Sequence, residues 1–552
     1  MRKWRTRGWS RVLVPGIAAV AAVVLAGSVS SAATMGSGSS NGSGSGSGNG
    51  EAWPTAGHDI GNTRDAAGEH LIGPGNASRL TTAWQITTAG DVMTTPAVAG
   101  GVVYFPDSGG KLWAVSAASG AVLWSQEVSS YTGISKSVSR TSPALYGNEL
   151  ILGDTSPAGH GTYEFAVDRR SGHLLWRTQV STHPAAKMTG AAVVYRGVAY
   201  VGVSSQEEVL GSEPGYQCCT FRGSVVALDA ATGRLLWQTY TVPAGYSGGA
   251  VWGSTPAIDP ADGLLYVGTG NNYSVPAGVC TAPGQTGCTQ PAADDHDDSV
   301  LALDMATGAV RWYKSTLTSD VAISICGARP SLTCGPDFDF GSGPNLIRLP
   351  SGRSLVGIGQ KSGEYWALDP RTGAVIWQTL VGPGSDFGGI QWGSATDGTH
   401  VYAAVSDFDG VPYQITSASG VRSTIIGGSW AELDAATGKV LWQTADPRHA
   451  ADLGYVSIGN RLVYAGSTAD VGDDMYVLDA ATGRILWSFD SGGPVSAGAA
   501  IVGGMVFWGS GEIWATQCPG GKGPLLACLG SNDKIYAFRL GGFPVGTGGG
   551  RK

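Results

Sequence analysis

The sequence predicts an all-β protein, an eight-bladed β-propeller closed by an N-terminal strand. An eleven-residue phrase related to ALDAATGRLLW recurs seven times, at intervals of 45 to 75 residues. The chain is rich in glycine (87 of 552 residues) and sparse in charge (14%), as is typical of turn-rich β structure. The two ends of the array also carry complementary halves of one more unit. Repetition at such a period indicates a fold built from stacked, similar units.

Each phrase predicts a tight hairpin. Its first residues alternate between apolar and other positions, as a half-buried strand does. The D-x-x-[TS]-G segment is a turn, in which Asp accepts backbone N–H groups and Gly adopts positive φ at low cost. The second strand ends in a tryptophan, whose large ring needs a buried site and whose N–H needs an acceptor. These tryptophans are Trp124, Trp176, Trp237, Trp312, Trp377, Trp442 and Trp487.

The number of blades follows from the ends of the array. One hairpin cannot bury its apolar face alone, so the units must pack as four-stranded blades around an axis. Trp84, in LTTAWQI, lies about one period before Trp124 but lacks a preceding hairpin strand. KIYAFRL, residues 534–540, is an inner strand without a Trp strand after it. Together they complete an eighth blade; the alternative is seven blades with frayed ends.

The termini predict processing and linker segments around one domain. Basic residues from Arg2 to Arg11 precede an apolar run and the small residues Ser31-Ala32-Ala33, which indicates a signal peptide over residues 1–33. A Gly/Ser linker follows over 34–50, then the propeller over 51–542 and a flexible tail over 543–552. We therefore expect a secreted or extracytoplasmic protein without a permanent membrane span.

Composition and cysteine spacing exclude several functions. The pI of about 5.5 and the lack of a basic patch argue against nucleic acid as a partner. No C-x-x-C-H motif is present, so covalent haem is excluded.

Six of the eight cysteines form locally spaced pairs that can staple loops of an exported protein. These pairs are Cys280 with Cys288, Cys326 with Cys334, and Cys518 with Cys528.

Cys218 and Cys219 are adjacent in GYQCCTFRG. Neighbouring Cα atoms lie about 3.8 Å apart across a trans peptide, below the usual disulfide range, so a bond between them requires a distorted peptide. We favour this vicinal bond because the other six cysteines pair locally. The alternative is that each bonds elsewhere or stays free.

The repeated phrase resembles the tryptophan-docking repeat of pyrroloquinoline quinone (PQQ) dehydrogenases. WPTAGHDIGNTRDA, from Trp53, is similar to the N-terminal signature of these enzymes. The same repeat also builds non-catalytic scaffold and binding proteins. The expectation of an enzyme therefore rests on residues between the repeats.

The resemblance selects candidate site residues, segment by segment. VGVSSQEEV resembles the stretch whose Glu binds the metal, which selects Glu208, with Glu207 as the alternative; GTGNNY selects Asn271 as a further ligand. CGPDFDFGSGP selects Asp337 as catalytic base and ligand, and GQKSGEYWALD selects Lys361. The remaining matches are Trp252 in VWGSTPAID, the cofactor floor, and Arg140 in SRTSPAL, a partner for a cofactor carboxylate.

The chemistry that the resemblance implies needs these residue types. Carboxylate and amide oxygens suit Ca²⁺, which would polarise the quinone C5 carbonyl as a Lewis acid. Asp337 would remove the hydroxyl proton as hydride passes to C5, and Lys361 would stabilise the developing quinol oxygen. Asp339, two residues after Asp337, adds a carboxylate that accompanies a lanthanide in some relatives; calcium is the ion we expect.

The segment around Cys218 and Cys219 resembles polyvinyl alcohol dehydrogenases more than methanol dehydrogenases. In the latter the adjacent cysteines precede the Arg that pairs with the cofactor. The resemblance thus implies an exported, PQQ- and calcium-dependent oxidoreductase of alcohol hydroxyls, with secondary hydroxyls on a polymer as the expected substrate and Cys218 and Cys219 beside the cofactor. It also implies an external electron acceptor such as cytochrome c. The alternatives are a non-catalytic propeller and a PQQ dehydrogenase of sugars or small alcohols.

Overall fold

The computed structural model describes residues 52–323, 334–512 and 530–542, which all belong to the unit Gly48–Lys552. The predicted signal peptide, the linker and the C-terminal tail lie outside these residues and stay predictions. So do Cys326, Cys518 and Cys528. In the described ranges the helices are short: η1 (Ala77–Arg79), α1 (Val128–Thr132) and α2 (Glu207–Leu210).

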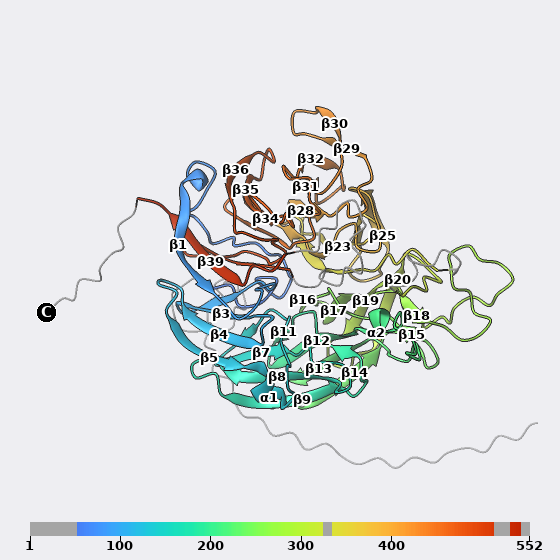
Figure 1. Ribbon diagram of the computed structural model, residues 1–552. Helices are drawn as coiled ribbons and strands as arrows, with labels where there is room; N and C mark the ends of the chain where they lie inside the picture. Colours follow the sequence, from blue (N-terminus) through green and yellow to red (C-terminus); the bar gives the residue numbers. More distant parts are fainter. Residues whose placement is uncertain (1–51, 324–333, 513–529, 543–552) are drawn as a thin grey trace, which may run out of the picture. The chain divides into compact units, whose positions relative to one another are not determined.

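In the described ranges eight antiparallel sheets form the blades, seven of four strands and one to which the short β10 adds a fifth, which confirms the predicted fold class (Figure 1). The first four blades are β2 (Ala97–Ala99), β3 (Val102–Pro106), β4 (Lys111–Ser116), β5 (Val122–Glu127); β6 (Ala144–Tyr146), β7 (Glu149–Gly153), β8 (Thr162–Asp168), β9 (Leu174–Ser181); β11 (Val193–Tyr195), β12 (Val198–Ser205), β13 (Ser224–Asp229), β14 (Leu235–Tyr240); and β16 (Ala257–Asp259), β17 (Leu264–Gly268), β19 (Ser299–Asp304), β20 (Val310–Ser315). The next three are β22 (Asn345–Arg348), β23 (Ser354–Gly359), β24 (Glu364–Leu368), β25 (Val375–Leu380); β27 (Ala395–Thr396), β28 (His400–Val405), β31 (Ser429–Asp434), β32 (Val440–Ala445); and β33 (Val456–Gly459), β34 (Leu462–Gly466), β35 (Met475–Asp479), β36 (Ile485–Phe489).

The eighth blade joins the two ends of the chain. Its strands are β37 (Ala500–Val502), β38 (Met505–Ser510), β39 (Lys534–Leu540) and β1 (Leu80–Thr87). Trp84 on β1 stands opposite Ala537 on β39. The predicted closure by an N-terminal strand is therefore confirmed, and the seven-blade alternative is wrong.

The repeated phrase docks each blade onto the next. In the turn after β13, Asp229 accepts hydrogen bonds from the backbone N–H and the hydroxyl of Thr232, at 3.0 and 2.7 Å. Gly233 follows with φ +71°, and a Cβ there would lie 2.4 Å from the Trp176 ring of the preceding blade. Trp176 in turn donates its indole N–H to the Ala230 carbonyl at 2.6 Å. The glycine thus serves both the turn and the ring above it.

The same contact closes the circle. Trp487, in the last complete repeat, donates its indole N–H to the Leu80 carbonyl on β1 at 3.0 Å. Trp84 on β1 then donates to Ala117 in the first repeat at 2.8 Å. Each blade therefore packs on two neighbours, and the apolar cores lie between blades rather than at one centre.

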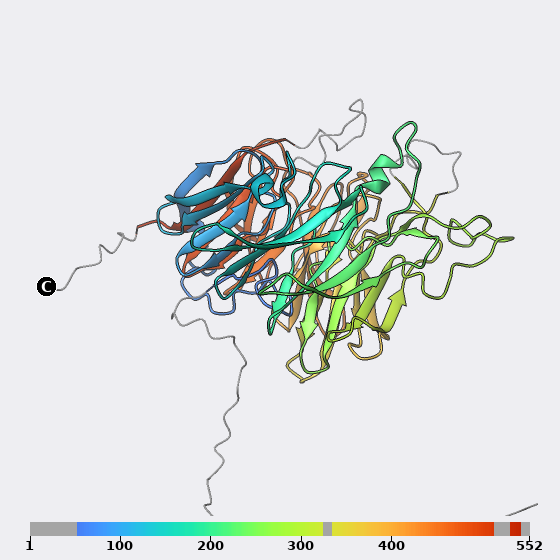
Figure 2. The same cartoon turned by 90° about the horizontal axis from the view of Figure 1, so that it is seen from below.

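Short strands outside the blades organise the long connections. They are β10 (Ala186–Lys187), which pairs with β12; β15 (Ser247–Gly248) with β18 (Asn272–Ser274); β21 (Ser342–Gly343) with β26 (Trp392–Gly393); and the hairpin β29 (Tyr413–Thr416) and β30 (Arg422–Ile425). The views in Figures 1 and 2 show the green connections around β15 and β18 extending beyond the blades. These loops carry most of the residues described next.

Candidate active site

A buried ammonium group bridges two carboxylates. Lys361 lies in the turn between β23 and β24, and its Nζ is 2.9 Å from Asp337 Oδ1 and 2.9 Å from Asp339 Oδ2. Asp337 and Asp339 belong to the segment that leads into β21. All three side chains are buried, with 5%, 8% and 1% of their residue surface exposed. Two residues selected from the sequence, Asp337 and Lys361, are thus in direct contact.

Asp339 connects this pair to two more selected residues. Its Oδ2 accepts the indole N–H of Trp252 at 2.7 Å, and its Oδ1 accepts the backbone N–H of Asn271 at 2.7 Å. The side-chain amide of Asn271 donates to the Ala322 carbonyl at 2.9 Å, which fixes the amide group in the site. In the sequence Asp339 is only a second carboxylate after Asp337; in the structure it is the hub of the cluster.

Burial and neighbouring charges shift the pKa values of the cluster in a consistent way. Burial raises the pKa of Asp337 well above its usual range, against the opposing effect of Lys361. Burial also raises the pKa of Glu208 to about 7, where Lys361 lowers it and Asp339 raises it. Burial lowers the pKa of Lys361, but the three carboxylates outweigh it and leave that pKa well above the ordinary value. The Lys361 ammonium is therefore charged, and it opposes the rise that burial causes in the pKa values of Asp337 and Glu208.

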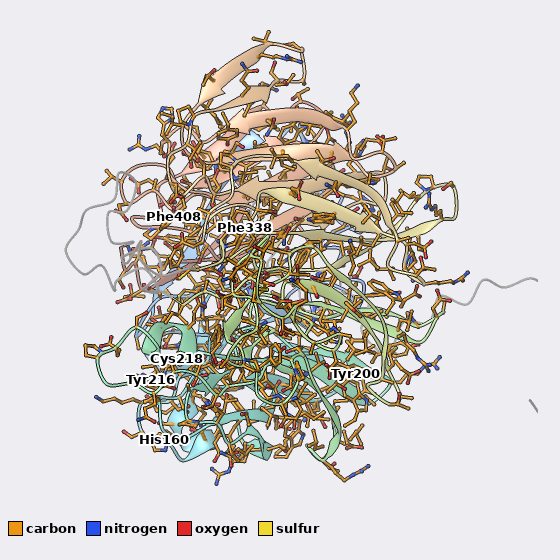
Figure 3. All side chains as sticks on the ribbon, turned by 90° about the vertical axis from the view of Figure 1, so that its right-hand side faces the viewer. His160, Tyr200, Tyr216, Cys218, Phe338 and Phe408 are labelled. Atoms are coloured by element: carbon orange, nitrogen blue, oxygen red, sulfur yellow. A yellow bond between two sulfur atoms is a disulfide. The ribbon has the colours of Figure 1, made fainter. Side chains whose placement is uncertain are left out.

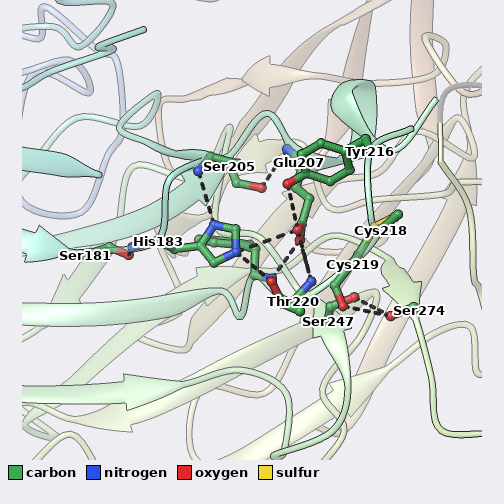
Figure 4. Close-up of polar contacts among 12 residues, drawn as sticks. Ser181, His183, Ser205, Glu207, Tyr216, Cys218, Cys219, Thr220, Ser247 and Ser274 are labelled. Atoms are coloured by element: carbon green, nitrogen blue, oxygen red, sulfur yellow. Dashed lines mark hydrogen bonds and ion pairs between the residues drawn. A yellow bond between two sulfur atoms is a disulfide. The ribbon is translucent and has the colours of Figure 1, made fainter. Parts of the chain in front are cut away.

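Glu207 and Glu208 on α2 have different surroundings. The Glu207 carboxylate is fully buried and accepts backbone hydrogen bonds from Thr220 and Phe221 (Figure 4). The charges of Lys361 and Asp339 instead act on the pKa of Glu208. Hydrogen bonds within its own loop thus occupy the Glu207 carboxylate, which favours Glu208 as the side chain available to a cation.

The donor set fits a hard divalent cation in its chemistry. Asp337 and Asp339 contact the Lys361 ammonium directly, and Glu208 is close enough to raise the pKa of Lys361, so negative charge is in excess when all three carboxylates are ionised. Carboxylate and amide oxygens are the ligands that Ca²⁺ prefers. In the described ranges, no three His, Cys, Asp or Glu side chains are already gathered tightly enough to hold a metal.

An aromatic wall links the cluster to Arg140. Lys361 Nζ lies 5.3 Å from the centroid of the Trp252 ring, and Trp252 packs edge-on against Trp392 at 5.2 Å. The Arg140 guanidinium stacks over Trp392 at 4.3 Å, and it lies 3.8 Å from Glu512. Arg140 therefore belongs to the same assembly. Trp392 was not selected from the sequence, although W-G-S occurs at both tryptophans.

A cavity of about 260 Å³ adjoins Arg140. Three basic side chains line it, from Lys136, Arg140 and Lys187, together with hydroxyls such as that of Ser139. Burial and the nearby Arg140 lower the pKa of Lys187 to about 8. Such a cavity can accept an anionic group. Lys136 and Lys187 have no motif that would mark them in the sequence.

Asp320 supports the loop that carries Asp337. Its buried carboxylate accepts the backbone N–H groups of Asp337 and Phe338, at 3.1 and 3.0 Å. Asp337 itself has φ +58°, so the loop is held in a conformation that non-glycine residues seldom adopt. The acidic run at 294–298 leads into β19.

The cysteines pair locally in the described part of the chain. Cys218 and Cys219 are bonded to each other and joined by a cis peptide, and Cys280 is bonded to Cys288. Cys334 is disulfide-bonded as well. Figure 3 shows Cys218 beside Tyr216. Cys219 packs against the same apolar cluster as Trp252.

Comparison with known proteins gives matches over most of the chain. The family model PQQ_2, described as outer membrane protein assembly factor BamB, matches residues 76–215, 220–384 and 427–517. A polyvinylalcohol dehydrogenase of Sphingopyxis sp. (strain 113P3) is 34% identical over 394 residues, which is 66% of this chain and 54% of that protein. A polyvinylalcohol dehydrogenase of Pseudomonas sp. is 32% identical over 65% of this chain and 55% of its own. The chain thus spans about half the length of these relatives.

Solved structures share the fold. A europium-containing methanol dehydrogenase superposes with a TM-score of 0.67 at 18% identity, covering 89% of this chain and 98% of that one. In the described ranges no helix is long and apolar enough to cross a membrane. These structures therefore agree with the propeller fold that the repeated phrase predicts.

Proposed function

This chain belongs to the PQQ-repeat propeller family that includes the quinoprotein alcohol dehydrogenases, and from that premise we propose that it oxidises alcohols with bound PQQ and Ca²⁺. One observation carries the proposal. Lys361, Asp337 and Asp339 form a buried cluster with Trp252 and Asn271, which arise from separate connections of the propeller. A propeller that only displayed a binding surface would not need to bury these charges together.

The residues of the chain divide the work of binding and catalysis. Glu208, Asn271 and Asp337 would hold the cation, Trp252 would support the flat ring system, and Arg140 would pair with a carboxylate. Cys218 and Cys219 would line the same cofactor site. When bound, PQQ supplies a quinone that takes up hydride, and Ca²⁺ supplies Lewis-acid polarisation.

Asp337 and Lys361 act at the reacting atoms. Asp337 Oδ accepts the proton of the substrate hydroxyl as the carbon loses hydride. A cation beside Asp337 would lower its raised pKa and keep it ionised, as a base must be. Lys361 Nζ donates a hydrogen bond to oxygen that gains negative charge. Burial of the cluster excludes water from these steps.

The proposed substrate is a secondary hydroxyl of polyvinyl alcohol or a similar polymer. The support is the 34% identity to a polyvinylalcohol dehydrogenase. Sugars and small alcohols are the competing substrates, and a non-catalytic scaffold is the competing function, in line with the description of the family model. We further propose an extracytoplasmic location and an external electron acceptor such as cytochrome c.

Reconstitution with PQQ and Ca²⁺, followed by dye-linked oxidation of a panel of alcohols, tests this function. The panel contains polyvinyl alcohol, a small secondary alcohol, a primary alcohol and an aldose. We expect turnover that requires PQQ, with the highest kcat/KM for secondary hydroxyls. An Asp262→Asn variant is the control, because Asp262 pairs with Arg371 on the surface. Preference for the aldose would replace the substrate assignment, and no turnover at all would favour the scaffold.

A further inference from the structure

Glu207 is a buried carboxylate that the proposed chemistry does not use. It neighbours Glu208 on α2, and its exposed fraction is 0%. Its side chain points toward the loop of residues 211–221, which carries Cys218 and Cys219 (Figure 4). A buried carboxylate persists only if its environment supplies donors.

The loop supplies those donors on both sides of the cysteines. Ahead of them, the Tyr216 hydroxyl donates to Glu207 Oε1 at 2.9 Å. After them, the Thr220 N–H lies 3.0 and 2.9 Å from the two oxygens, and the Phe221 N–H donates to Oε2 at 2.6 Å. His183 Nε2 lies 3.6 Å from Oε1. One side chain therefore fastens both arms of the loop.

Other contacts hold the bonded cysteines against the propeller. The Ser274 hydroxyl donates to the Cys219 carbonyl at 3.3 Å and contacts Ser247 at 2.7 Å. A Cβ added to Gly211 would lie 2.7 Å from Cys218 Sγ, so the start of the loop runs directly against the pair. The loop therefore lies between α2 and the paired strands β15 and β18, of which β15 precedes Trp252 and β18 directly follows Asn271.

We propose that Glu207 is a positioning residue that docks the Cys218–Cys219 loop beside the cofactor site. The proposal rests on the function proposed above. Because Glu207 and Glu208 are consecutive, α2 would hold the loop with one carboxylate and the cation with the next. A carboxylate suits this role because it only accepts hydrogen bonds, whereas the amide of a glutamine would turn an N–H toward these donors.

The test compares Glu207→Gln with Glu213→Gln, an exposed carboxylate in the same loop. Amide hydrogen exchange in the apoprotein is measured at Thr220 and Phe221, and PQQ dissociation is measured by absorbance in the presence of Ca²⁺. We expect Glu207→Gln to speed both about tenfold or more, with Tm nearly unchanged and Glu213→Gln like the wild type. Tyr216→Phe, which removes one donor, gives a smaller change in the same direction and serves if Glu207→Gln does not fold.

The outcomes separate this inference from the proposed function. Unchanged exchange at Thr220 and Phe221 overturns the docking role, whatever the protein binds. Faster exchange with unchanged PQQ dissociation overturns the link between the loop and the cofactor. If the wild type binds no PQQ, the function fails, and the exchange data still decide whether Glu207 docks the loop.

Discussion

Trp252 and Asp339 are 87 residues apart in the chain, and the indole N–H of the first donates to the carboxylate of the second at 2.7 Å. This bond orients the aromatic wall and the acidic cluster as one unit. Asp339 also contacts Lys361 and Asn271, so the effects of substitutions at these positions on stability should not be additive.

Asp337→Asn should abolish turnover and largely preserve PQQ binding. The amide cannot remove a hydroxyl proton, so kcat should fall by about 100-fold or more. PQQ binding measured by absorbance should stay close to the wild-type value, because Trp252 and Arg140 are intact. Near-normal kcat in this variant would remove Asp337 from the mechanism.

Removal of the metal should inactivate the enzyme reversibly. Glu208, Asn271 and Asp337 offer the oxygen ligands that motivate this expectation. We expect EDTA to eliminate dye-linked activity and Ca²⁺ to restore it, with a parallel sample given a lanthanide to compare the two ions. Full activity in a sample that holds PQQ but is shown to be metal-free would contradict the assignment.

Substitution of Gly233, the turn glycine under the Trp176 ring, should destabilise the protein, and a control can separate the ring contact from the backbone strain. Gly233→Ala places a Cβ 2.4 Å from the Trp176 ring at φ +71°. We expect a loss of about 2–4 kcal/mol in the free energy of unfolding. Gly263→Ala is the matched control, since its φ is +67° but a Cβ there meets nothing within 4 Å. Gly263→Ala should lose only the energy of placing a non-glycine residue at positive φ, about 1–2 kcal/mol.

Equal losses in the two glycine variants would show that the ring contact contributes nothing. Urea unfolding of both proteins at one temperature provides the comparison.

Asp65 should make the folded protein less stable as pH rises. Burial, followed by the charges of Asp397 and Asp59, raises the pKa of Asp65 to about 7. An acid whose folded pKa is raised contributes its stability below the unfolded pKa, and loses it as pH rises through the folded value. Asp65→Asn should therefore match the wild type near pH 4 and be more stable than it at pH 8.

Thermal unfolding of both proteins across this range checks the Asp65 prediction. Parallel stability curves for the wild type and Asp65→Asn would contradict it.

The repeat made the fold predictable, because each phrase contains its own turn, glycine and docking tryptophan. The closure of the propeller could also be predicted, because the Trp84 segment and the strand at residues 534–540 each form only part of a blade. The site was predictable only where a segment resembles a known one. Trp392, Lys187 and Asp320 escaped detection because their roles arise from contacts between distant loops.

The sequence favoured Glu208 but left Glu207 open, since adjacent residues fit the same motif. The distinction depends on the direction of each side chain from α2, and so on the position of the loop around Thr220. Likewise, the hub role of Asp339 depends on donors from two other connections. Spacing along the chain does not carry that information.

Titration of the apoprotein with PQQ in the presence of Ca²⁺ tests the central claim most directly. The absorbance of bound quinone should saturate at about one equivalent per chain. The variants Lys361→Met and Arg140→Ala should each bind PQQ much more weakly than the surface control Asp262→Asn. Failure of folded wild-type protein to bind PQQ saturably, or binding unaffected by both substitutions, would contradict the assignment of this site.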